Sequence, residues 1–111
     1  MTLKRIFVAS PYTLGDTGEN VHNAITTAND LIDLGFAPFS PLLSHFLHIY
    51  HPRPYEDWVA QDNCWLILCD AVLRLDGESI GADNECRLAI DNKIPVFYDL
   101  RELVKHFRRG E

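Results

Sequence analysis

The sequence predicts a doubly wound α/β domain with a parallel sheet in the order 2-1-3-4 and helices on both faces. Short apolar runs alternate with segments of helical periodicity, and no linker or repeat interrupts them. The length of 111 residues suits a single domain spanning 1–111. In such a sheet ligands bind beyond the carboxyl ends of the strands, where the winding reverses. That point is expected between the first and third strands.

Four apolar runs are the expected strands. They are short, rich in β-branched and aromatic residues, and followed by turn signals or by the start of a helix. In chain order they span 5–9, 36–39, 71–75 and 95–98.

Capping signals and apolar periodicity predict the helices. Asp16 and Glu19 have the spacing of a capping box, and apolar residues then recur at helical spacing until Gly35 ends the helix. Segment 42–54 is interpreted as a short helix running into a loop. Further helices are expected over 55–68, 79–92 and about 100–109, the last of them capped by Gly110.

Composition excludes several classes of function. The net charge of −6 argues against a polymeric nucleic acid partner, because such binding relies on clustered Lys and Arg. No apolar stretch reaches 18 residues, so no membrane span is expected. Cys64, Cys69 and Cys86 are odd in number and form no CxxC pair, which favours a reduced, cytoplasmic protein without disulfides.

The sequence predicts no cofactor and no metal. "GDTG" before the first helix lacks the GxGxxG pattern of dinucleotide sites, and no Walker A sequence is present. His45, His48 and His51 are three residues apart, so two of them could share a metal on one helix. Their aromatic surroundings favour a half-buried, hydrogen-bonded cluster instead.

Two carboxylates interrupt the apolar stripes of two predicted helices. Glu85 lies three or four residues from Ala82, Leu88 and Ala89, and Asp62 is similarly placed among tryptophan and aliphatic residues. Burying a carboxylate raises its pKa unless it is paired, and two such acids can divide the roles of nucleophile and proton donor. Alternatively, each acid lies at the edge of its stripe and reaches water, Arg74 or Arg87.

The loop "ASPYT" after the first strand supplies a second set of polar groups. The hydroxyls of Ser10, Tyr12 and Thr13 lie where a ligand is expected, and they suit a sugar or a carboxylate. Spacing alone favours the simpler alternative, a turn with a packed tyrosine.

Several segments together resemble a known family. The stretches "IFVASPYT", "GFAPFSP", "DWVAQDNCWLILCDAVLRLDG" and "SIGADNECRLAIDNKIPVFY" are similar to the nucleoside 2-deoxyribosyltransferase-like superfamily, and more narrowly to its branch of unknown function DUF1937. The resemblance covers nearly the whole chain. It implies a small flavodoxin-like domain that assembles as a homodimer or higher oligomer, in which neighbouring subunits complete each other's sites.

The resemblance also implies roles for particular residues. Glu85 matches the glutamate that attacks the anomeric carbon of a deoxyribonucleoside or its monophosphate, and Asp62 matches an aspartate that assists in proton transfer. Tyr12 matches a tyrosine that positions the nucleophile. Ser79 matches a serine that contacts the 5′ phosphate, and Asp76 corresponds loosely to a sugar-binding aspartate. With the loop hydroxyls and glycines, the expected substrate-binding residues are Ser10, Thr13, Asp76, Gly77, Ser79 and Gly81.

The chain departs from the family pattern in ways that leave three functions open. It is shorter than the transferases, and the acidic "TLGDTG" replaces the basic, glycine-rich loop that grips phosphate in the hydrolases. The first expectation is an N-glycosidic hydrolase or transferase acting on a small nucleoside or nucleotide. The second is a module that binds a nucleotide-like ligand without turning it over. The third is an oligomeric interaction protein that uses segment 42–50 as its interface.

Overall fold

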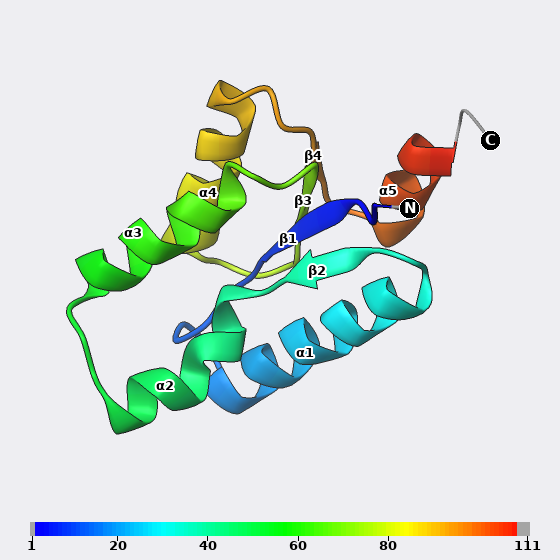
Figure 1. The fold of residues 1–111 in the computed structure, drawn as a ribbon. Coiled ribbons are helices and arrows are strands. Elements are labelled where there is room, and N and C mark those ends of the chain that lie inside the picture. The colour runs from blue at the N-terminus through cyan, green and yellow to red at the C-terminus, as the bar shows by residue number, and fades with distance from the viewer. Residues whose placement is uncertain (1, 109–111) are drawn as a thin grey trace.

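A four-stranded parallel sheet forms the centre of the computed structural model, which describes residues 2–108 (Figure 1). The strands β1 (Arg5–Ala9), β2 (Ala37–Phe39), β3 (Ala71–Arg74) and β4 (Val96–Phe97) lie in the order β2-β1-β3-β4. All three neighbouring pairs are parallel. The predicted fold class and strand order are therefore confirmed, and the winding reverses between β1 and β3.

The helices follow the predicted alternation, with corrections at their ends. They are α1 (Thr17–Asp33), the 3₁₀ turn η1 (Pro41–Ser44), α2 (His45–Tyr50), α3 (Tyr55–Leu66), α4 (Ile80–Asp91) and α5 (Leu100–Arg108). The helix expected in 42–54 is thus split into η1 and α2. Each strand after β1 is one or two residues shorter than predicted, and α3 ends two residues early. Residue 109 and the predicted cap Gly110 lie outside the described residues.

Alternation along β1 divides the core into two layers. Ile6 and Val8 pack with residues of α1 and α5 on one face of the sheet, whereas Phe7 and Ala9 pack with α3 and α4 on the other. All four side chains are completely buried. Each large apolar side chain buried in this way contributes roughly 1.5–3 kcal/mol. Figure 1 shows the resulting three-layer arrangement, with α1 and α5 on the face opposite α3 and α4.

Side-chain caps fix the start of two helices at the carboxyl edge of the sheet. The Asp16 carboxylate accepts from the Glu19 amide at 3.0 Å, as the predicted capping box requires. The Ser79 hydroxyl accepts from the Ala82 amide at 3.0 Å. Because both caps lie next to the ends of β1 and β3, the first turns of α1 and α4 flank the point where the winding reverses.

The helices α2 and α3 bury few side chains. No side chain of α2 is buried, and Leu66 is the one buried side chain of α3. Within the described part of the chain, no helix has the length and apolar character needed to cross a membrane.

Candidate active site

Asp62 on α3 and Glu85 on α4 are close enough for their charges to interact. Burial, and after it the charge of Asp62, raise the pKa of Glu85, the charge of Arg74 opposes them, and the net result is a pKa of about 8. Burial also raises the pKa of Asp62 to about 6. Neither carboxyl forms an ion pair with any residue in 2–108. The two acids therefore titrate as an interacting pair and together retain a proton near neutral pH.

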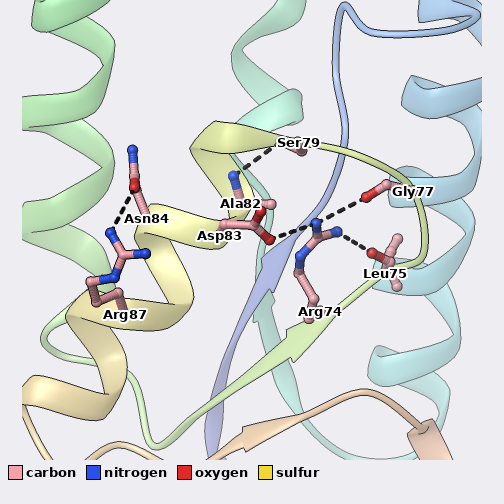
Figure 2. A network of polar contacts seen from close by, with 8 residues as sticks. All are labelled: Arg74, Leu75, Gly77, Ser79, Ala82, Asp83, Asn84 and Arg87. Carbon is pink, nitrogen blue, oxygen red and sulfur yellow. Dashed lines mark hydrogen bonds and ion pairs between the residues drawn. The ribbon is translucent and has the colours of Figure 1, made fainter.

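Arg74, at the end of β3, organises the loop that leads into α4 (Figure 2). Its guanidinium donates to the carbonyls of Leu75 and Gly77, the latter at 2.9 Å, and to the Asp83 carboxylate at 3.0 Å. The Arg74 side chain is buried, and Figure 2 shows it enclosed by this loop. Arg74 thus pairs with Asp83, not with Glu85, while its charge still acts on Glu85.

The sequence suggests Arg74 only as a partner for the two acids. The feature that marks its larger role is its position inside the apolar run "AVLRL", on the strand face that packs against α4. The other arginine considered, Arg87, hydrogen-bonds Asn84 at 3.4 Å on the exposed side of α4. Figure 2 shows that this contact lies apart from the Arg74 network.

Tyr12 has a partner on α2. Its hydroxyl hydrogen-bonds Nδ1 of His45 at 2.5 Å, and the two rings meet edge to face. Burial raises the pKa of Tyr12. Nearby, the Trp58 indole donates to Nδ1 of His48 at 2.9 Å. These bonds agree with the expected half-buried, hydrogen-bonded cluster for His45 and His48, whereas His51 is exposed. The described residues contain no group of three or more His, Cys, Asp or Glu placed to hold a metal.

Two glycines of this region lie where a neighbouring side chain comes close to the backbone. A Cβ on Gly77, whose φ is +116°, would lie 2.8 Å from Cγ of Pro11, so the loops after β1 and β3 touch there. A Cβ on Gly81 would lie 3.2 Å from the hydroxyl of Tyr55. Tyr55 therefore reaches from the start of α3 to the first turn of α4. Sequence reasoning did not find Tyr55, because no local pattern links it to residue 81.

Ser10 and Asp76 line a hollow of about 300 Å³ on the opposite side of this loop contact. Its other walls come from Pro11, Leu75 and the residues Asn20, Asn23, Thr26 and Thr27 of α1. Glu85 and Asp62 are not part of it. The predicted site residues thus form two groups, because Ser10 and Leu75 face α1 whereas Glu85, Asp62 and Arg74 lie on the α3 and α4 side. Thr13 is exposed in the loop between β1 and α1.

Comparison with known proteins shows a relationship of fold. No family model matches the sequence, so the DUF1937 branch is not confirmed, and no curated protein matches it either. A solved 2-deoxyribosyltransferase from the psychrotolerant bacterium Bacillus psychrosaccharolyticus superimposes with a TM-score of 0.59. The chain has the fold of that enzyme. The match covers 83% of this chain and 69% of that one at 20% sequence identity. That transferase is described as a biocatalyst for the synthesis of nucleosides.

Proposed function

We propose that the protein cleaves or transfers at the N-glycosidic bond of a small nucleoside or nucleotide, preferably of the deoxy series. The observation that carries the proposal is the pair of interacting, half-buried carboxyls, Glu85 and Asp62, whose pKa values burial raises. The shared fold with a 2-deoxyribosyltransferase supports the same class of reaction.

In the proposed reaction, a carboxylate oxygen of Glu85 attacks the anomeric carbon of the sugar. The C1′–N bond breaks, its electron pair leaves with the base, and Asp62 supplies the proton that the departing nitrogen takes up. Water or a second base then attacks C1′ and releases Glu85, with Asp62 accepting the proton of the incoming group. Water gives hydrolysis, and a second base gives transfer.

The pKa values make the protonation state of this pair decisive. Glu85 acts as a nucleophile only when ionised, and Asp62 acts as an acid only when protonated, yet Glu85 has the higher pKa in the free protein. With pKa values near 6 and 8, the productive form is roughly 1% of molecules at pH 7. We therefore expect a bell-shaped dependence of kcat/KM on pH, with flanks near 6 and 8.

The surrounding groups suit a sugar or a phosphate. Ser79 caps α4 through its oxygen and still has its hydroxyl proton to donate, at a helix N-terminus that favours an anion. Tyr12 would orient the nucleophile Glu85. Because the Tyr12 hydroxyl is bonded to His45, this role requires it either to leave His45 or to contact both residues. Thr13, Gly77 and Gly81 are the remaining proposed substrate contacts at this pair, whereas Ser10 and Asp76 line the hollow on the α1 side.

Incubation with pooled deoxynucleosides and deoxynucleotides, analysed for free base by chromatography, tests the proposal. Wild type should release base, whereas Glu85→Gln and Asp62→Asn should not. Glu78→Gln is the control, because Glu78 is an exposed carboxyl in the loop between β3 and α4, and this variant should match wild type. Thermal stabilisation by a ligand without product, retained in Glu85→Gln, would contradict catalysis and favour a binding module.

We also propose that the protein forms a homo-oligomer through the exposed apolar face of α2. This short helix buries none of its side chains, and large apolar residues cover it. The exposed residues of this face, which we call the α2 face, are Leu43, Phe46, Leu47, Ile49 and Tyr50. Exposed apolar residues clustered in this way are typical of an interaction surface.

A further inference from the structure

The inward side of α1 carries both apolar and polar residues. It buries Ala24, Ala28 and Leu31. Asn20 and Thr27 lie three or four residues from those positions, on the same side of the helix, but they are only partly buried. Polar residues therefore occupy the sheet-facing stripe near the carboxyl ends of β1 and β3. That placement is as unexpected for a packing helix as Glu85 is on α4.

These residues form one wall of the hollow described above, which encloses about 300 Å³. This volume is at the lower end of those found for small-molecule sites and suits a ligand of monosaccharide size. Pro11 and Leu75 provide its apolar surface, and Asp76 stands at its edge with an exposed carboxylate. No basic side chain is among the residues that line it.

The Asn20 side chain is already fixed in a way that shapes the hollow. Its amide group donates to the backbone carbonyls of Tyr12 and Leu14, each at 2.9 Å. Both donor hydrogens are therefore used, and its oxygen is the group left for a ligand. With the Asp76 carboxylate and the lining hydroxyls, the hollow offers more acceptors than donors.

The Ser10 hydroxyl is the one buried side-chain polar atom in residues 2–108 that has no hydrogen-bond partner. A buried hydroxyl without a partner is costly, so such a group calls for an explanation, such as a bound water, ion or ligand. Ser10 lines the hollow, and rotation of its side chain between staggered positions changes where the hydroxyl points. A ligand in the hollow would supply the missing partner.

We propose that this hollow is a binding site for a neutral polyol of monosaccharide size, either as a free sugar or as the sugar of a nucleoside. The ligand's hydroxyls would donate to Asp76 and Asn20 and exchange hydrogen bonds with Ser10 and Thr27. The C–H face of its ring would lie on Pro11 and Leu75. The single carboxylate and the absence of lining cations disfavour phosphorylated ligands. The site is separate from Glu85, across the contact of Pro11 with Gly77.

Amide NMR spectra of ¹⁵N-labelled protein, titrated with D-ribose, uridine and ribose 5-phosphate, test this site. NMR is preferred to thermal shift because polyols stabilise many proteins without binding them. Ribose should shift amides in 20–27 and 75–77 with millimolar affinity, and ribose 5-phosphate should bind more weakly. If uridine shifts the same amides, the site also takes a nucleoside's sugar. No saturable shift in these segments with any of the three compounds would overturn the proposal.

Variants separate ligand contacts from structural effects. Ser10→Ala should weaken ribose binding roughly three- to tenfold while leaving Tm unchanged or higher, because the hydroxyl lacks a partner in the free protein. A loss of Tm with unchanged affinity would contradict the assigned role. Asn23→Ala should also weaken binding, whereas Asn29→Ala, an exposed amide on α1 outside the hollow, should not.

The variant Glu85→Gln distinguishes this proposal from the proposed catalytic function. Ribose binding in the hollow should be the same in Glu85→Gln as in wild type, even if neither protein releases base from any nucleoside. If Glu85→Gln abolishes the shifts in 20–27, the sugar is bound at the carboxylate pair and the separate site is wrong.

Discussion

Glu85 is expected to make the folded protein less stable as the pH rises. Its pKa rises from 4.5 to about 8 on folding, so between these values the folded state binds more protons than the unfolded state. Stability must then fall with increasing pH across this window. Glu85→Gln removes this dependence, so its gain in unfolding free energy over wild type should grow by about 2 kcal/mol between pH 6 and pH 8.

Urea denaturation of both proteins at several pH values measures this difference. Comparing variant with wild type cancels the contribution of the five histidines, which titrate in the same range. Glu78→Gln is the matched control, because Glu78 is an exposed carboxyl of the neighbouring loop. A gain for Glu85→Gln that is the same at both pH values would show that Glu85 is not buried as a protonated acid.

Individual residues differed in how well the sequence predicted their surroundings. Glu85 and Asp62 were found because helical periodicity turns a buried acid into a visible break in a local pattern. The bond between Tyr12 and His45 joins residues 33 positions apart, and nothing in either segment indicates the other. Whether Arg74 pairs with Asp83 or Glu85 also depends on the loop geometry, which no spacing rule supplies.

At the scale of elements, Arg74 holds the loop between β3 and α4. Replacing it with Met keeps much of the buried stem but leaves the carbonyls of Leu75 and Gly77 without their donor. We expect Arg74→Met to lower the unfolding free energy by about 2–4 kcal/mol. The same denaturation experiment measures it. Asp83→Asn keeps an acceptor for Arg74, and the Asp83 side chain is 65% exposed, so it should lose less than about 1 kcal/mol. Equal losses of unfolding free energy in the two variants would show that the ion pair with Asp83, and not the bonds to the loop carbonyls, provides the stabilisation.

Two side-chain bonds hold α2 in place. Because α2 buries no side chain, the bonds of His45 with Tyr12 and of His48 with Trp58 are its principal polar links to other elements. Tyr12→Phe and Trp58→Phe should each raise hydrogen exchange in 45–50, with little change in α4. Mass spectrometry of exchange measures this locally. Tyr98→Phe, an exposed tyrosine after β4, is the control, and unchanged protection of α2 in both variants would contradict the role of these bonds.

The strands were easier to predict than their ends. The central strands β1 and β3 are continuous apolar runs because both of their faces are buried, and such a run is a local property of the sequence. Where a strand stops depends on its neighbour. The Leu75 amide still donates to the Ala9 carbonyl, but the regular ladder of β3 ends at Arg74, where its side chain begins to organise the following loop.

At the scale of the whole molecule, the two proposed ligand sites lie on opposite faces of the sheet. The carboxylate pair lies on the α3 and α4 side, and the polar hollow lies on the α1 side. Strand order alone predicts the edge of the sheet at which ligands are expected, because that edge depends on topology. The division between the two sides arises from the contact of Pro11 with Gly77, a packing detail that topology does not contain.

The proposed assembly rests on the α2 face. Phe46 is 67% exposed there, and a charge at the centre of an apolar interface disfavours association. We expect wild type to have a mass of at least two chains by light scattering, and Phe46→Glu to return it to the 12.7 kDa of one chain. Ile32→Glu is the matched control, because Ile32 is 60% exposed on α1, outside this face, and should leave the mass unchanged. A wild type that stays at 12.7 kDa at every concentration would contradict the proposed assembly.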